Sequence, residues 1–195
     1  MCAGRCVLIA AVILAAGASR RLGEPKQLVK LGEVTLLERS VRVAREAGLS
    51  PVVVVLGCQA DRILAGCEFG DAVKLVNDEW EEGMASSIRV GVAKCQDLLA
   101  KIEGIVILAC DQPAVTAQHL QSLFSGTTSV TASKYGQRKG IPAYFPTSTF
   151  SELMTLHGDV GARDFLRDAA SIELPHGNLD IDTVDNLQVA RRLFS

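Results

Sequence analysis

An apolar run that leads directly into a loop of small and basic residues constrains the fold of this chain more than any other stretch. Residues 7–14 are apolar at every position, and the sequence Leu14-Ala-Ala-Gly-Ala-Ser-Arg-Arg-Leu-Gly-Glu-Pro-Lys26 follows. A strand in a parallel sheet is buried on both faces, so an unbroken apolar run is typical of such a strand. The sequence therefore predicts a buried strand whose carboxyl end carries the loop.

The composition of this loop suits a polyanionic ligand. Gly17 and Gly23 free the backbone, and the small side chains between them let N–H groups approach an anion closely. Arg20, Arg21 and Lys26 supply positive charge, and a triphosphate is the ligand that this combination favours. The candidate nucleotide-binding residues are Leu14, Ala15, Ala16, Gly17, Ser19, Arg20 and Lys26, of which Arg20 and Lys26 are also candidate catalytic residues.

Two common phosphate-binding motifs do not fit the loop. The P-loop has four residues between its glycines and then Lys-Ser/Thr, whereas five residues separate Gly17 from Gly23 and Glu24-Pro25 follow. The pattern G-x-G-x-x-G of dinucleotide-binding proteins is also absent from the loop. The spacing therefore indicates a different kind of triphosphate loop.

The same segment has features of a secretory signal peptide, with Arg5 before the apolar run and an Ala-x-Ala sequence that ends at Ala18. Cleavage there would discard the strand that leads into the loop, and the run is shorter than the ~20 apolar residues of a membrane span. We therefore favour the strand and expect a cytoplasmic protein without a membrane partner.

The composition fits one domain over residues 1–195. The formal net charge is −2 and 48% of the residues are hydrophobic, which does not favour a nucleic-acid partner. The six cysteines form no C-x-x-C pattern. Cys95 and Cys110 lie in apolar runs, which predicts buried free thiols in a reducing compartment.

Further strands and helices are expected to alternate along the chain. A capping-box pattern begins at Thr35, apolar strands are predicted at 51–56, 73–76 and 105–109, and a short helix at 61–65. This alternation predicts an α/β fold with a doubly wound, mainly parallel sheet. Ligands of such sheets bind beyond the carboxyl ends of the strands.

Asp111 follows the strand 105–109 and lies at that edge of the sheet. A carboxylate in this place is a suitable Mg²⁺ ligand. The alternative is that Asp111 caps the next helix, although Thr116 fits that role better because the helix is predicted to begin at Gln118. We therefore favour Asp111 as a metal ligand and as a candidate catalytic residue.

The segment after the strand 73–76 is acidic, with four carboxylates between residues 78 and 82, most of which we expect to point into solvent. A helix is predicted from Val90 to Cys95. Ser86 or Ser87 would either cap this helix or offer a hydroxyl group to a nucleotide. Both interpretations stay open at this point.

Two motifs near the C-terminus carry candidate site residues. Gly158-Asp-Val-Gly-Ala-Arg163 opens a predicted helix, and Arg163 at a helix start favours a bound anion. The alternative is that Asp159 caps the helix and pairs with Arg163. Asp180 and Asp182 share one side of an extended segment, where they suit a cation, whereas Thr183 offers a simple helix cap.

These motifs, in this order, resemble the nucleotidyltransferases that activate sugars and cofactors, and most closely the molybdenum cofactor cytidylyltransferases (MobA-like NTP transferases). The resemblance runs from Val12 to about Leu193 and implies a Rossmann-like domain with Mg²⁺ on Asp111 and Asp182. It also implies that CMP passes from CTP to the phosphate of a molybdenum-pterin acceptor with release of pyrophosphate. A molybdenum hydroxylase apoenzyme would be a protein partner.

The resemblance extends the set of candidate site residues. On the nucleotide side it adds Asn77, Gly83 and Ser87. On the acceptor side it implies Gly140, Pro142, Gly158, Asp159, Arg163 and Asp180. Three alternatives stay open: transfer from GTP, a sugar-phosphate acceptor, and a maturation chaperone that carries the pterin without catalysis.

Overall fold

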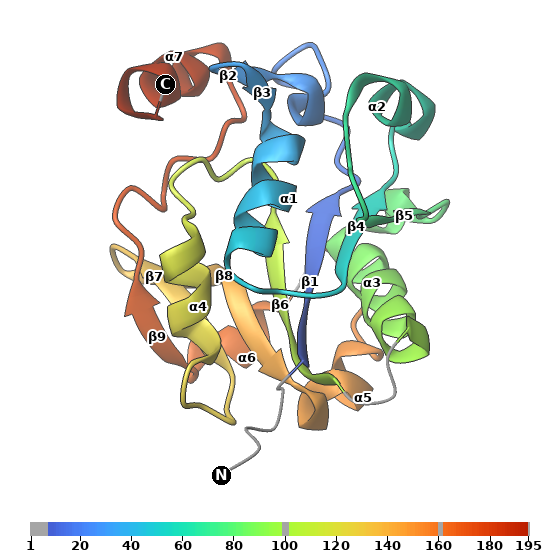
Figure 1. Ribbon diagram of the computed structural model, residues 1–195, viewed down its shortest axis with the longest axis vertical. Helices are drawn as coiled ribbons and strands as arrows, with labels where there is room; N and C mark the ends of the chain where they lie inside the picture. Colours follow the sequence, from blue (N-terminus) through green and yellow to red (C-terminus); the bar gives the residue numbers. More distant parts are fainter. Residues whose placement is uncertain (1–7, 99–101, 160–161, 195) are drawn as a thin grey trace, which may run out of the picture.

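The computed structural model describes residues 8–98, 102–159 and 162–194, and its centre is a seven-stranded sheet (Figure 1). The strand order is β5-β4-β1-β6-β8-β7-β9, and β8 runs antiparallel to both of its neighbours while the other pairs are parallel. The strands are β1 (Leu8–Ala15), β4 (Val52–Leu56), β5 (Val73–Val76), β6 (Ile102–Ala109), β7 (Thr131–Tyr135), β8 (Arg138–Pro146) and β9 (Ala170–Glu173). The predicted doubly wound, mainly parallel α/β fold is confirmed.

Helices cover both faces of this sheet. In Figure 1, α1 and α4 lie in front of the sheet, and α3, α5 and α6 lie behind it. A two-stranded hairpin, β2 (Lys30–Leu31) with β3 (Val34–Thr35), stands apart from the main sheet. The helices are α1 (Leu36–Glu46), α2 (Ala60–Gly66), α3 (Met84–Leu98), α4 (Ala117–Phe124), α5 (Phe150–Leu153), α6 (Arg163–Arg167) and α7 (Val184–Phe194).

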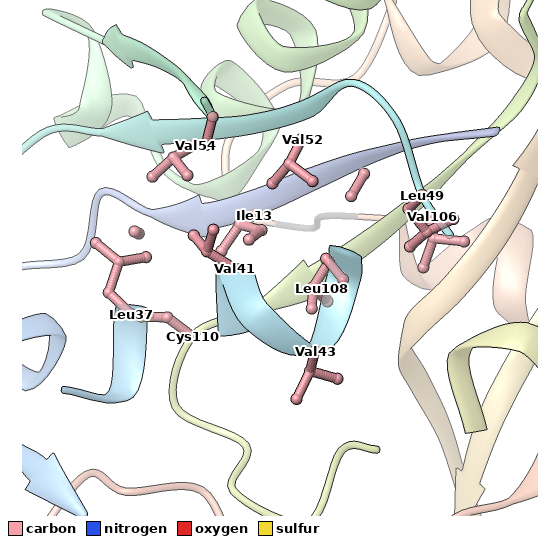
Figure 2. Close-up of a cluster of buried hydrophobic side chains, with 14 of the residues drawn as sticks. Ile13, Leu37, Val41, Val43, Leu49, Val52, Val54, Val106, Leu108 and Cys110 are labelled. Atoms are coloured by element: carbon pink, nitrogen blue, oxygen red, sulfur yellow. The ribbon is translucent and has the colours of Figure 1, made fainter. Parts of the chain in front are cut away.

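The hydrophobic core is divided between the two faces because successive side chains of a strand point to opposite sides. Ile13 of β1 packs with Val41 of α1 on the front face (Figure 2), and Val12 packs with Val92 of α3 on the back face. These four side chains are at most 2% exposed. The double burial explains why the central strands are apolar at every position.

The sheet has its switch point between β1 and β6. The chain moves outward from β1 to β4 and β5 and returns to the other side of β1 as β6. Leu14 and Ala109 are register partners, so β1 and β6 end at the same level. The loops that follow them therefore meet at this edge of the sheet, as expected for a doubly wound fold.

The C-terminal segment packs over this edge. Ile181 is fully buried in a cluster with residues of the β2–β3 hairpin and of α7, and its N–H donates to the Asp111 carbonyl at 2.9 Å. This cluster brings residues 180–182 beside the loop that follows β6. Asn186 N–H donates to Thr183 Oγ1, so the expected Thr183 cap of α7 is confirmed.

Local sequence signals located several other elements correctly. Thr35 and Glu38 form the reciprocal capping box at the start of α1, and Thr116 caps α4. Cys95 and Cys110 are buried free thiols.

Within the described ranges, no helix is long and apolar enough to cross a membrane.

One helix prediction was wrong. The helix after the acidic segment begins at Met84 rather than near Val90, and Ser86 and Ser87 lie within its first turns. Neither serine is therefore its N-cap. The error arose because the apolar pattern of the first turn, Met84 and Ala85, is short and follows four acidic residues. The start of the first predicted strand, Val7, lies outside the described residues.

Candidate functional site

A cavity of about 680 Å³ opens at the carboxyl ends of β1 and β6. Its walls come from the loop after β1, the residues that end β6, the segment before α3 and the loop before α6. The residues that line it are Leu14, Ala15, Ala16, Gly17, Arg20, Lys26, Gln27, Trp80, Glu81, Glu82, Gly83, Met84, Ser87, Ala109, Cys110, Asp111 and Asp159.

A smaller cavity of about 160 Å³ lies beside the first. Gly17, Arg20 and Lys26 line both cavities, and Asp182 lines the smaller one. Three cationic residues therefore line these cavities: Arg20 and Lys26 line both, and Arg21 lines the smaller one. This placement agrees with the predicted binding of an anion by the loop.

Gln27 holds the shape of the loop after β1. Its side chain is 1% exposed, and its Nε2 group donates to the carbonyls of Ala15 at 2.6 Å and Gly17 at 3.2 Å. The Ser19 hydroxyl accepts from the backbone N–H of Lys26 at 3.0 Å. Both contacts join the two ends of the loop, so the backbone is fixed before any ligand arrives.

Lys26 joins the loop to the two segments that carry the candidate metal ligands. Its Nζ atom lies 2.6 Å from Asp111 Oδ2 and 2.6 Å from Asp182 Oδ1. Burial by itself would lower the pKa of Lys26, but the charges and hydrogen bonds of Asp111 and Asp182 outweigh that effect and raise the pKa. Lys26 is therefore a permanently charged group between two carboxylates.

The acidic residues of the C-terminal segment differ in their surroundings. Asp182 also pairs with Arg21 at 2.7 Å; burial would raise the pKa of Asp182, but Lys26 and Arg21 lower it. Burial raises the pKa of Asp180 to about 6, and the charges of Asp111 and Asp182 add to this shift. The Oδ1 atom of Asp180 is buried and has no hydrogen-bond partner among the residues that the structure describes.

Two carboxylates of the site are placed to bind one divalent metal ion together with a ligand. Among the described residues no group of three or more His, Cys, Asp or Glu side chains is placed to hold an ion. Asp111 and Asp182 nevertheless converge on one cation, the Lys26 ammonium. Mg²⁺ is often held by one or two carboxylates together with phosphate oxygens and water. The pair fits a metal that arrives with a triphosphate.

The three residues expected beside the nucleotide have different positions. Gly83 and Ser87 line the larger cavity. Asn77 is buried, and its Nδ2 group donates to the hydroxyls of Ser86 at 2.8 Å and Ser87 at 3.0 Å. Asn77 therefore holds the first turns of α3 from beneath and does not line the cavity.

The residues expected on the acceptor side are only partly brought together. Asp159 lines the cavity, and Gly158 lies next to it against the start of α3. Gly140 and Pro142 lie on β8 and are not among the residues that line the two cavities. Gln112 connects that strand to the site by donating to the Ile141 carbonyl at 3.1 Å.

The alternative in which Asp159 caps the following helix is wrong. The N-cap of α6 is Ala162, and Asp159 Oδ1 instead accepts from the N–H of Met84 at 3.5 Å. Arg163 is the first residue of α6. Its side chain, together with Val160 and Gly161, lies outside the described residues.

Sequence reasoning missed several residues of the cavity. Glu82 was expected in solvent, but its carboxylate forms a two-point pair with Arg89 at 2.8 and 2.6 Å. Trp80, the single tryptophan of the chain, lines the cavity, and so does Gln27. An aromatic residue within an acidic loop was a usable signal for Trp80, whereas no local pattern marked Gln27.

A switch-point cavity beside a basic loop, with two carboxylates that converge on one cation, is typical of an α/β nucleotide-binding protein. The chain belongs to the MobA-like NTP transferase domain family, whose match covers residues 11–174. The predicted family is therefore confirmed, and with it the class of nucleotidyltransferases.

Curated relatives with different described roles are similar to this chain. Purine catabolism protein PucB of Bacillus subtilis is 31% identical, with 94% of this chain and 96% of PucB covered. Nicotine blue oxidoreductase of Paenarthrobacter nicotinovorans is 29% identical, with 92% and 94% covered. A probable molybdenum cofactor guanylyltransferase of Opitutus terrae is 37% identical, with 56% and 50% covered.

The solved structures of Rv0371c from Mycobacterium tuberculosis have the same fold over nearly the whole chain. One has a TM-score of 0.84 at 30% identity and covers 95% of this chain and 98% of its own. Another, a complex with manganese, has a TM-score of 0.79 at 27% identity, with 95% and 99% covered. The Rossmann-like nucleotidyltransferase fold is thus confirmed, and a divalent metal is consistent with it.

Proposed function

We propose that this protein transfers CMP from CTP to the phosphate of a molybdenum-pterin acceptor and releases pyrophosphate. The observation that carries the proposal is the convergence of Asp111 and Asp182 on Lys26 beside the loop after β1. A triphosphate–metal complex needs carboxylates that bind the metal ion and, close to them, a cation that binds the phosphates. The site offers them at the edge of the sheet where ligands of this fold bind.

The residues of the loop would bind and orient the triphosphate. Ala15, Ala16 and Gly17 line the larger cavity, and the cations Arg20 and Lys26 line both cavities. Asp111 and Asp182 would hold Mg²⁺, which when bound neutralises charge on the phosphates. Positioning and electrostatic stabilisation carry this type of transfer, so no covalent nucleophile is required.

The acceptor would enter from the side of Asp159. An oxygen of its phosphate forms a bond to the α-phosphorus in line, and the bond to the bridging oxygen of the leaving pyrophosphate breaks. The proposed acceptor residues are Gly140 and Pro142 of β8, Gly158, Asp159, Arg163 and Asp180. The similarity to the Opitutus relative, a probable molybdenum cofactor guanylyltransferase, supports this acceptor class.

CTP is proposed over GTP because of the size of Ala16. This residue is 8% exposed and lines the cavity, and its methyl group narrows the space beside the loop. A purine needs more room than a pyrimidine. One methyl group discriminates by only ~1–3 kcal/mol, so other wall residues contribute to selectivity. Equal kcat/KM values for CTP and GTP would overturn this part of the proposal.

Pyrophosphate release with each of the four nucleoside triphosphates, with and without the molybdenum-pterin acceptor, tests the function. We expect acceptor-dependent release, fastest with CTP. Binding of the pterin without release from any triphosphate would instead identify a carrier that hands the cofactor to a molybdenum hydroxylase apoenzyme. Release with a sugar phosphate in place of the pterin would identify a different acceptor class.

The Asp111→Asn variant tests the metal ligand. It keeps the shape of the side chain and removes the charge that would fix the ion. Turnover should fall at least about a hundredfold, which corresponds to ~2.7 kcal/mol of transition-state stabilisation. A wild-type rate with wild-type magnesium dependence would show that Asp111 is not a metal ligand.

A further inference from the structure

The segment before α3 and the loop before α6 are joined by a group of contacts centred on Glu82. Glu82 Oε1 accepts from Arg89 at 2.8 Å and from the N–H of Gly158 at 3.2 Å, and Oε2 accepts from Arg89 at 2.6 Å. Arg89 also donates to the carbonyl of Leu156. One ion pair therefore holds both ends of the 156–158 loop against α3.

The charges of this pair are partly shielded from solvent. The side chains of Glu82 and Arg89 are 31% and 18% exposed. The hydrogen bonds from Arg89, with the N–H of Gly158, lower the pKa of Glu82 to about 2, so the carboxylate is charged at neutral pH. Bidentate pairs between arginine and carboxylate fix geometry as well as charge.

The backbones of the two segments approach each other closely beside this pair. Gly83 has φ 121°, a region that L side chains rarely adopt, and a Cβ atom on it would lie 2.7 Å from Gly158 C and O. The Gly158 carbonyl accepts from the N–H of Ala85 at 3.1 Å. The loop before α6 therefore supplies a cap for the N-terminus of α3.

The two joined segments form different walls of one cavity. Trp80, Gly83 and Ser87 line it from the α3 side, and Asp159 lines it from the loop before α6. The proposed function assigns the first wall to the nucleotide and the second to the acceptor. Glu82 lies between them, at the edge of the same cavity.

We propose that Glu82 is a positioning residue that sets the place of the acceptor loop relative to the nucleotide, through Arg89 and the N–H of Gly158. This inference rests on the proposed function. In-line transfer requires the attacking oxygen to lie close to the phosphorus and aligned with the leaving group, and small misplacements lower the rate strongly. Loss of the carboxylate releases the acceptor loop, while the loop after β1 and Lys26 stay in place.

The test compares Glu82→Ala with Asp78→Ala, which removes an exposed carboxylate from the same segment. For Glu82→Ala we expect KM for the acceptor to rise and kcat/KM for it to fall about tenfold or more. Affinity for CTP, read from the fluorescence of Trp80, should change less than twofold. Asp78→Ala should match the wild type in all three measurements.

The conservative variant Glu82→Gln separates positioning from charge. It retains one oxygen for Arg89 and Gly158, so it should recover part of the acceptor kcat/KM that Glu82→Ala loses. Two results would overturn the proposal: an unchanged acceptor KM in Glu82→Ala, or a loss of CTP affinity as large as the loss for the acceptor. The second would show that Glu82 supports the nucleotide wall in general.

Amide hydrogen exchange measures the coupling between Glu82 and the loop before α6 without depending on catalysis. In Glu82→Ala, exchange at Gly158 and Ala85 should accelerate while exchange in β1 stays unchanged, and Asp78→Ala should show neither effect. If the wild type releases no pyrophosphate with any acceptor, the proposed function fails and exchange alone decides the coupling. Unaltered exchange at Gly158 would refute it.

Discussion

At the scale of single residues, the position of Lys26 is the feature with the strongest chemical consequence. Its ammonium group lies between Asp111 and Asp182, in the place where a divalent cation held by the same two carboxylates would lie. An ammonium and a metal ion cannot share that space. Triphosphate binding would therefore favour metal binding, because the phosphates offer Lys26 a new partner.

The variant Lys26→Met should change the affinities for metal and for triphosphate in opposite directions. Without the ammonium, Asp111 and Asp182 repel each other, so Mn²⁺ should bind more tightly in the absence of nucleotide. The triphosphate should bind more weakly, since a charge-assisted contact is worth ~1.5–3 kcal/mol. Electron paramagnetic resonance of free Mn²⁺ and titration of Trp80 fluorescence with CTP measure the two effects.

Lys94→Met is the matched control for this experiment, because Lys94 lies on α3 and lines neither cavity. It should leave both affinities unchanged. If Mn²⁺ binds Lys26→Met no more tightly than the wild type, the two carboxylates are not the metal ligands.

At the scale of elements, the C-terminal segment completes the site. It carries Asp182 to Lys26 across 156 positions of the sequence, and the buried side chain of Ile181 fixes it on the cluster formed with α7. The docking cluster is separate from the two clusters that fill the faces of the sheet. Loosening it should therefore affect the site more than the rest of the fold.

The variant Ile181→Ala should raise the magnesium concentration needed for half-maximal activity. Replacing a buried isoleucine by alanine costs ~2–5 kcal/mol and loosens the segment that holds Asp182. Leu153→Ala is the comparison, because Leu153 is also fully buried but lies in the cluster on the back face. Equal magnesium dependence in both variants at similar stability would show that docking by Ile181 does not place the ligand.

The elements that local patterns predicted are those with a local cause. The apolar run of β1, the capping box of α1 and the cap of α4 at Thr116 depend on residues within a few positions of one another. The start of α3 was missed because its first turn has only a short apolar pattern and is capped by Gly158 from a distant loop, which no local signal marks. Sequence order therefore marked Lys26, Asp111 and Asp182 as candidates, but not the contacts that bring them together.

At the scale of the whole molecule, a chain of hydrogen bonds joins α4 to β7 and β8. His119 is 8% exposed, and its Nε2 lies 2.7 Å from Ser133 Oγ on β7. The Ser133 hydroxyl donates to the Pro142 carbonyl on β8 at 2.6 Å. Because the hydroxyl proton of Ser133 is donated to Pro142, the Ser133 oxygen accepts a hydrogen bond from His119. The neutral His119 ring therefore carries its proton on Nε2.

Because of this buried neutral histidine, the free energy of unfolding should depend on pH. Burial lowers the pKa of His119. At neutral pH the ring is neutral in both folded and unfolded chains. As the pH falls below about 6.5, the unfolded chain binds a proton that the folded chain does not, so the free energy of unfolding falls with pH. The loss continues until the folded-state pKa is reached.

The variant His119→Gln keeps an N–H donor for Ser133 and removes the titrating group. Urea unfolding of the wild type and this variant at pH 7.5 and pH 5.5 should show a smaller loss of stability on acidification in the variant. His176→Gln, which replaces an exposed histidine, should lose as much as the wild type. An equal loss in all three proteins would mean that His119 is protonated in the folded state, and that the bond to Ser133 is made by the charged ring.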